Sequence, residues 1–178
     1  MQQEILDFWF NQIEQKLWWQ KDDAFDRLIT KKYSAIHQQA SRCELYPWRE
    51  SAQGRLAEII ILDQFSRNMF RDSALAFAND SLALTLAQEA VSSGADKELS
   101  QLQRGVLYLP YMHSESRKIH DVALALYKKN GIQTNYDFEL KHKKIIDQFG
   151  RYPHRNKILD RQSTEEELAF LTLPGSGF

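Results

Sequence analysis

Two charged residues extend an apolar stripe in the segment 51–71. The stripe runs through Leu56 and Ile60 at helical spacing. It continues to Asp63 and then to Arg67, which lie four residues apart. An acid and a base at this spacing on a helix can form an ion pair. The pattern therefore predicts a carboxylate and a guanidinium where a plain helical core would carry leucine.

Three further ionisable residues follow or interrupt apolar stripes. His113 comes just after the stripe that ends at Leu109, Glu115 heads the stripe of the next helix, and His142 lies within a later one. Imidazole and carboxylate groups are the usual acids and bases of enzymes. His113, Glu115 and His142 are therefore the catalytic candidates, expected to be buried and to lie close to Asp63. The alternative for either histidine alone is a hydrogen-bonded core residue.

A short motif occurs twice in the chain. The sequence at 63–67 (Asp-Gln-Phe-Ser-Arg) is echoed at 147–151 (Asp-Gln-Phe-Gly-Arg), and each copy is followed by an arginine-bearing segment. Arginine offers forked donors that suit carboxylate or phosphate, so converging segments would form an anion pocket. The predicted ligand-binding residues are Asp63, Arg67, Asn68, Arg71, Arg151, His154, Arg155 and Asn156.

The structural alternative is that these segments only brace the ends of helices, whose free carbonyls also attract cationic donors. His154 and Arg155 lie in a predicted loop and not on an apolar stripe, so we expect their truncation to cost little core packing. Truncating such a side chain usually changes the free energy of unfolding by less than about 0.5 kcal/mol.

The chain contains no nucleophile elbow and no glycine-rich phosphate loop, so no cofactor and no reaction class are predicted. A metal site would have to combine His113, Glu115 and His142 with Asp63 or His154. These residues lack the tight spacing of zinc ligands, and we therefore predict no metal.

Helical periodicity covers nearly the whole sequence. There are only seven glycines and four prolines, and no segment alternates with period two. Short connections favour antiparallel neighbours, so we expect one all-α domain, residues 1–178, of about eight helices in stacked hairpins. Ser114 and Thr134 are predicted helix caps, and Leu28, Val122 and Phe138 are placed in the core. The expected helices are approximately 5–9, 23–40, 51–65, 81–93, 98–111, 115–130, 135–149 and one that opens at 163–167.

Composition excludes several classes of protein. The net charge of −1 gives no overall attraction to nucleic acid or to lipid. A single cysteine, Cys43, excludes an intrachain disulfide. The N-terminus lacks the features of a signal peptide, and the longest apolar run, 105–112, is too short to cross a bilayer. A cytoplasmic protein with no membrane contact is expected.

Several long motifs resemble a known family. They are 62–71 (Leu-Asp-Gln-Phe-Ser-Arg-Asn-Met-Phe-Arg), 76–80, 111–115, 149–156 and 163–167, together with Trp18 and the pair Phe25-Asp26. The chain is similar in these to the bacterial domain-of-unknown-function family 924. The resemblance implies a tetratricopeptide-like all-α fold, in which the helical hairpins stack into a right-handed superhelix, and brings no established activity. Two positions depart from the family pattern: Ser66 stands where proline is usual, and Asp160 where glycine is usual.

Three functions compete at this point. The first is a pocket for a small anionic metabolite. The second is a peptide-binding helical scaffold that holds a C-terminal carboxylate in a basic groove. The third, RNA binding, rests on nine Lys/Arg against four Asp/Glu in 128–161, and the acidic remainder of the chain argues against it. The sequence does not indicate an oligomeric state.

Overall fold

The structure is a computed structural model, which describes residues 1–177. These residues form helices and connecting loops, with no β-strand among them, so the predicted all-α class is confirmed. The longer helices are α2 (Asp23–Ser41), α3 (Ala52–Ile60), α5 (Asp80–Ser92), α8 (Arg117–Asn130) and α9 (Gln133–Phe149). The shorter α-helices are α1 (Gln2–Asp7), α4 (Ser66–Met69), α6 (Gln101–Leu107), α7 (Leu109–Met112) and α10 (Glu165–Leu171). Single turns of 3-10 or π-helix are η1 (Phe8–Gln12), η2 (Gln15–Trp18), η3 (Tyr46–Glu50), η4 (Ile61–Phe65), η5 (Ala74–Phe77), η6 (Ala95–Glu98) and η7 (Pro153–Arg155).

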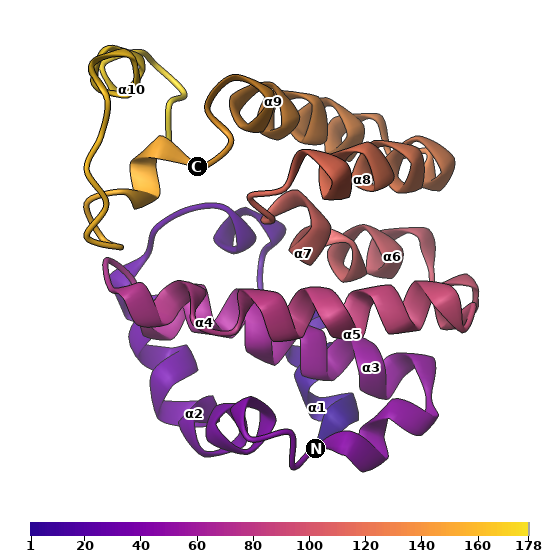
Figure 1. Ribbon diagram of the computed structural model, residues 1–178. Coiled ribbons are helices and arrows are strands. Elements are labelled where there is room, and N and C mark those ends of the chain that lie inside the picture. Colours follow the sequence, from indigo (N-terminus) through magenta and orange to yellow (C-terminus); the bar gives the residue numbers. More distant parts are fainter. Residues whose placement is uncertain (178) are drawn as a thin grey trace.

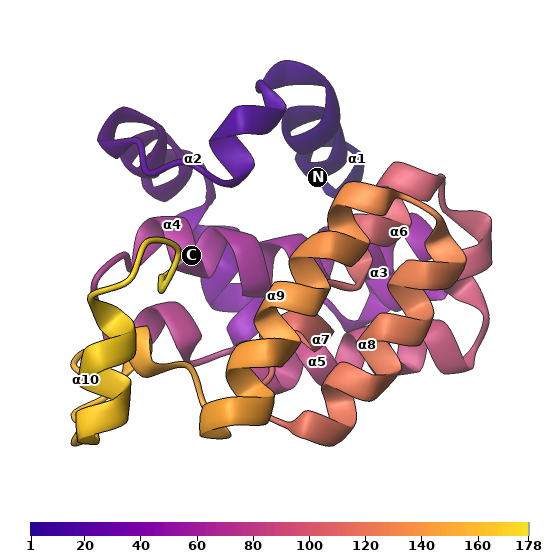
Figure 2. The ribbon, with the colours of Figure 1, turned by 90° about the horizontal axis from the view of Figure 1, so that it is seen from above.

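The helices stack in an order that follows the chain. Helix α5 packs against α3 on one side and α7 on the other, α7 packs against α8, and α8 against α9 (Figure 1). The last two form an antiparallel hairpin, because Gly131 follows α8 in the left-handed conformation at φ +80° and only Gly131 and Ile132 separate the helices. Both ribbon views place α10 at the end of the molecule away from α6 (Figures 1 and 2).

An aromatic cluster fills the N-terminal half of the core. The Phe65 ring stacks on Tyr33 with centroids 4.8 Å apart and meets Trp9 edge-on at 5.7 Å. Phe8 meets Tyr33 in a T-shaped contact at 5.1 Å. These rings are almost completely buried, and such geometries are the favoured ones for aromatic pairs. The cluster fixes Phe65, and thereby the π-turn η4 that carries Asp63.

Several predicted boundaries are confirmed. Asp22 caps α2 and Ser51 caps α3 through their side chains. The helix expected over 98–111 is broken at Tyr108 into α6 and α7, as the position of Pro110 predicts. At the start of α10, Thr164 and Glu167 form a reciprocal capping box.

The predicted caps at Ser114 and Thr134 are wrong. Ser116 precedes α8 and Ile132 precedes α9, and neither makes a side-chain cap. The Ser114 carbonyl instead faces the His120 ring, with its oxygen 2.8 Å from Nε2, which keeps this residue outside the helix. Glu115 therefore lies in the loop between α7 and α8 and does not head the α8 stripe.

Three residues predicted to lie in the core are exposed: Leu28 (46%), Val122 (41%) and Phe138 (50%). The reason is clearest in α9, whose buried face carries Glu139, His142, Ile145 and Ile146. Phe138 shares the helical angle of this face, between those of His142 and Ile145, and is nevertheless half exposed. The periodic pattern therefore identified the buried face of α9, but not the positions along the helix at which neighbouring elements cover it.

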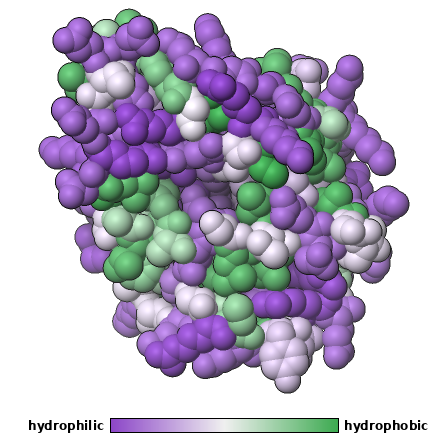
Figure 3. All heavy atoms as spheres, viewed as in Figure 1, coloured by the Kyte–Doolittle hydropathy of each residue, from purple (hydrophilic) through white to green (hydrophobic). Residues whose placement is uncertain are grey.

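Apolar and polar residues are mixed on the surface. Figure 3 shows a largely hydrophilic face on which hydrophobic residues gather in separate patches. Among residues 1–177, no helix combines the length and the apolar character needed to span a membrane.

Asp160 offers a test of the local backbone. It is exposed and has φ +52°, in the left-handed region that glycine adopts most readily. We expect Asp160→Gly to raise the free energy of unfolding by about 0.5–1 kcal/mol, measured by urea denaturation. The matched control is Asp137→Gly on the exposed side of α9, where the same change should be destabilising. An equal loss in both variants would contradict the strained conformation of Asp160.

Candidate functional site

The carboxylate of Asp63 is the centre of a buried polar network. It is 1% exposed. Its Oδ1 lies 2.7 Å from His113 Nδ1 and 2.9 Å from Arg67 Nη1, and its Oδ2 accepts a hydrogen bond from Gln64. Burial opposes ionisation, but Arg67 and His113 outweigh it and hold the Asp63 pKa well below its usual range. Asp63 is therefore a buried anion at neutral pH.

A chain of alternating charges leads away from Asp63. Arg67 Nη1 lies 3.0 Å from Asp80 Oδ1, and Arg67 Nη2 donates to Asp80 Oδ2 at 3.1 Å. Arg155 Nη1 reaches the same Oδ2 at 3.3 Å. The order is thus Asp63, Arg67, Asp80, Arg155. Arg67 of the first motif copy and Arg155 of the second arginine-bearing segment thus share Asp80, whereas Arg71, the arginine of the first such segment, is not part of this chain.

Arg155 is buried, contrary to the small contribution to core packing that its loop position predicted. The residue is 6% exposed, and its guanidinium carbon lies 4.6 Å from the ring centroids of both Phe77 and Tyr152. Its Nε has no hydrogen-bond partner. Burial and the nearby Arg67 lower the Arg155 pKa from its ordinary value. A loop position gave no sign of this burial, because it has no periodicity to reveal a buried face.

A cavity of about 330 Å³ opens beside this network. It lies between the 74–84 region, the end of α7 and the 153–159 segment. Asp80 and Arg155 reach it from the charge chain, and His113 reaches it from the Asp63 pair. Its remaining lining includes Ser81, Ser114 and Glu115, and its apolar walls include Phe77, Leu84, Pro110 and Leu159.

His113 presents one ring edge to Asp63 and lines the cavity. With Nδ1 bound to a carboxylate, the neutral ring carries its proton on Nδ1 and a lone pair on Nε2. Burial is the main cause, and Arg67 a second one, of a His113 pKa below the ordinary value. The imidazole is therefore neutral at pH 7.

Glu115 lines the same cavity but is already bound. Arg161 donates to both of its oxygens, at 2.6 and 2.9 Å, and the Tyr152 amide donates to Oε1 at 2.8 Å. Burial alone would raise the Glu115 pKa, but these donors lower it. Glu115 therefore ties the loop before α8 to the 152–161 segment.

His142 is buried and is not among the residues lining the cavity. Its Nδ1 bonds to the Phe138 carbonyl at 2.8 Å, and its ring centroid lies 5.8 Å from that of Tyr152. Burial lowers its pKa to about 3. The His154 ring centroid lies 5.6 Å from that of Tyr152, and burial together with the Arg155 charge lowers the His154 pKa to about 4. Of the three catalytic candidates, His113 and Glu115 share a cavity, and His142 does not.

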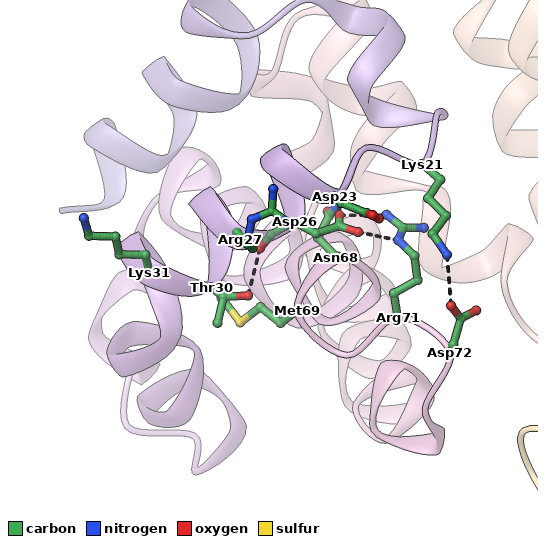
Figure 4. A pocket seen from close by; sticks show the side chains of 10 residues that line it. All are labelled: Lys21, Asp23, Asp26, Arg27, Thr30, Lys31, Asn68, Met69, Arg71 and Asp72. Atoms are coloured by element: carbon green, nitrogen blue, oxygen red, sulfur yellow. Dashed lines mark hydrogen bonds and ion pairs between the residues drawn. The ribbon is translucent and has the colours of Figure 1, made fainter.

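Arg71 and Asn68 lie apart from this cavity. Both donate to Asp26 of α2: Arg71 through two nitrogens, and Asn68 through its amide at 2.8 Å. Figure 4 shows them in a separate, open depression between α2 and the end of α4, also lined by Lys21 and Asp72. Their donors fasten the first segment to α2.

Arg151 and Asn156 face α10. Arg151 donates to both Glu167 oxygens, at 2.6 and 2.7 Å, and Asn156 to Glu167 Oε2 at 3.2 Å. The sequence echo does not extend to the structure, because Gly150 ends α9 at φ +71° before Arg151 can pair with Asp147. Asp147 is exposed and pairs with Lys143 instead.

Sequence reasoning missed five participants. Asp80 was recognised only as a residue at a helix start, and Phe77 and Tyr152 only as parts of motifs. His120 and Glu139 form a pair that is completely buried, with 2.6 Å between Nδ1 and Oε1, and burial raises the Glu139 pKa. The available signal was the regular spacing of Glu139 with His142 and Ile146 on α9. Within residues 1–177, no group of three or more His, Cys, Asp or Glu is arranged to hold a metal ion.

The depressed pKa of His142 predicts a pH dependence of stability. The unfolded chain binds this proton below about pH 6.5, whereas the folded chain binds it only near pH 3, so stability falls as the pH drops between these values. Replacement by glutamine keeps a donor and removes the titration. Between pH 6 and pH 4 we expect His142→Gln to lose roughly 2 kcal/mol less than wild type in urea unfolding. Parallel losses in the two proteins would contradict a neutral buried His142.

Two of three comparisons with known proteins found a match. A family model described as "Bacterial protein of unknown function (DUF924)" matches residues 5–175. A solved structure, of the protein of unknown function ATU0120 from Agrobacterium tumefaciens, is 38% identical, covers 96% of each chain and has a TM-score of 0.91. No curated protein matches at a significant level. The resemblance drawn from the motifs is confirmed, and the chain belongs to the bacterial family of unknown function DUF924.

Proposed function

We propose that this protein binds a small anionic ligand, a carboxylate or a phosphate, in the cavity between Arg155 and His113. The observation that carries the proposal is the incomplete pairing of Arg155. A guanidinium has five donors. Here one long bond of 3.3 Å joins it to Asp80, and Nε has no partner.

Burial makes this shortage of partners costly. A buried polar group without a hydrogen bond costs about 1–3 kcal/mol, and a charged one costs more. Asp80 Oδ2 already accepts from Arg67 and Arg155, and Asp80 Oδ1, 3.0 Å from Arg67 Nη1, makes no hydrogen bond, so the pairing at this end of the charge chain is incomplete. The cavity next to Arg155 leaves room for an external acceptor, and Phe77 and Tyr152 hold the guanidinium plane in place. A planar carboxylate or a phosphate oxygen pair matches that donor geometry.

The charges around the cavity predict how such a ligand would be balanced. Asp63 and Asp80 already compensate Arg67 and Arg155, and Arg161 compensates Glu115. A bound anion therefore adds an uncompensated negative charge. His113 is the neutral group beside the cavity that can gain a proton.

The exposed, single Cys43 supports placing this anion-binding protein in a reducing cytoplasm.

A thermal-shift experiment tests the anion site directly. Phosphate, succinate and benzoate are added to wild type and to Arg155→Met, which keeps an unbranched side chain between the two rings. An anion at about a hundredfold its dissociation constant stabilises the native state by roughly 2.7 kcal/mol, or about 5–10 °C for a chain of this size. We expect the shift in wild type and its loss in Arg155→Met.

The matched control is Arg151→Met. This arginine belongs to the same segment, but its donors serve Glu167 and not the cavity. The variant should melt at a lower temperature, because Glu167 loses its partner, and should keep the full anion shift. A wild type indifferent to all three anions, or an equal shift in Arg155→Met, would contradict the proposal.

Proton uptake provides a second prediction. The pKa of His113 lies below its ordinary value in the free protein, and a bound anion would raise it. Binding between these two pKa values takes up a proton, so affinity should be highest below the free-state pKa and should weaken as the pH rises through the bound-state value. Titration calorimetry of succinate in buffers of different ionisation enthalpy measures this uptake. We expect up to one proton per site in wild type and none in His113→Gln.

A further inference from the structure

We propose that the cavity is also a hydrolytic site, in which His113 acts as the general base on an ester of a small anion. The inference rests on the proposed anion site, because Arg155 would hold the charged part of the substrate. Asp63 is the positioning residue of the pair.

The geometry of the pair gives His113 its orientation. Asp63 lies inside the protein and takes the Nδ1 edge at 2.7 Å. The two nitrogens of an imidazole point away from each other across the ring, so Nε2 is directed away from Asp63. His113 is at the same time a wall of the cavity. A carboxylate that fixes the tautomer and leaves Nε2 as the acceptor is the arrangement that general-base histidines require.

The other histidine in a carboxylate pair lacks this freedom. His120 faces Glu139 Oε1 through Nδ1 at 2.6 Å and the Ser114 carbonyl through Nε2 at 2.8 Å, and it is completely buried. Both of its nitrogens are thus engaged inside the protein. Both pairs join a histidine to a carboxylate, but only His113 lines the cavity.

The surroundings keep the base in its active form. Titratable or charged groups surround His113 on η4, α4, α5 and α9, in the loop before α8 and on the 153–159 segment. Burial is the largest influence on the His113 pKa and lowers it, and Arg67 lowers it further. Asp63 and Asp80 raise it, but the pKa stays below its ordinary value and the ring is neutral. An anionic substrate would bring the pKa closer to neutral pH, where a general base is most effective. The facing groups are Asp63, Arg67, Asp80, Glu115, His142 and Arg155.

The proposed step is balanced by water alone. His113 Nε2 takes a proton from a water molecule, and the water oxygen forms a bond to the ester carbonyl carbon. The bond from that carbon to the alcohol oxygen breaks, and the leaving oxygen receives the proton from Nε2. An ester and water become a carboxylic acid and an alcohol, and the histidine returns to its neutral state.

The first experiment tests whether the Nε2 lone pair of His113 is accessible from the cavity. Diethyl pyrocarbonate acylates neutral imidazole nitrogens that it can reach, and peptide mass spectrometry assigns the site. We expect His113 to be acylated, at a rate that rises with pH through its pKa, and His120 to be unmodified in the native protein. Asp63→Asn should slow the reaction at His113, because the substituted amide no longer favours a proton on Nδ1.

The second experiment measures hydrolysis with a matched pair of esters. 4-Acetoxybenzoate carries the anion, and methyl 4-acetoxybenzoate lacks it. We expect wild type to hydrolyse the anionic ester faster than the neutral one, with a rate that rises with pH to a plateau. His113→Gln keeps a donor toward Asp63 and should lower the rate about 100-fold or more, and Arg155→Met should abolish the preference for the anion.

The two proposals fail separately. A benzoate-induced thermal shift without hydrolysis above the buffer rate, and with His113 unmodified, would overturn the general base and leave the binding site. Hydrolysis that His113→Gln retains would also overturn it. Absence of any shift with benzoate, phosphate or succinate would overturn the anion site itself, and that result is read on wild type without turnover.

Discussion

The buried carboxylate of Asp63 is the interaction on which the rest of this structure depends. It lies on a π-turn that the aromatic cluster of Phe8, Trp9, Tyr33 and Phe65 holds in place. An ionised group at that depth is stable only with partners, and Arg67 and His113 provide them from two other elements. Loss of Arg67 would leave the buried charge uncompensated, and loss of His113 would remove a hydrogen bond from its Oδ1. The relative positions of η4, α4 and the end of α7 are therefore set by one carboxylate.

The same logic carries outward along the charge chain. Arg67 shares the Asp63 carboxylate with His113. It also pairs with a second carboxylate, that of Asp80, at the start of α5. A carboxylate there also interacts favourably with the helix dipole. Arg155 is the last member and has the poorest pairing. Because Arg155 ends the charge chain beside a cavity, an external anion bound there would supply its missing partner. The proposed function follows from the unequal distribution of partners and not from the fold.

Periodicity predicted the parts of this arrangement that lie on helices. The spacing of Leu56, Ile60, Asp63 and Arg67 gave the central pair, and the breaks at Pro110 and Gly131 gave the helix ends. It failed where contacts join loops that are distant in sequence. Neither the burial of Arg155 nor the pairing of Arg151 with Glu167 has a local signal, since both depend on how α9 ends and where the chain returns.

Duplicate motifs illustrate the limit of such reasoning. Two segments that read Asp-Gln-Phe and end in arginine behave oppositely, because the fourth residue is Ser66 in one and Gly150 in the other. Ser66 continues the helix and donates to the Leu62 carbonyl, so Asp63 and Arg67 stay one turn apart. Gly150 adopts a left-handed conformation, which directs Arg151 toward α10 and leaves Asp147 in solvent. One backbone conformation thus decides which copy becomes part of the buried network, and the second contributes to it only through the residue that follows four positions later, Arg155.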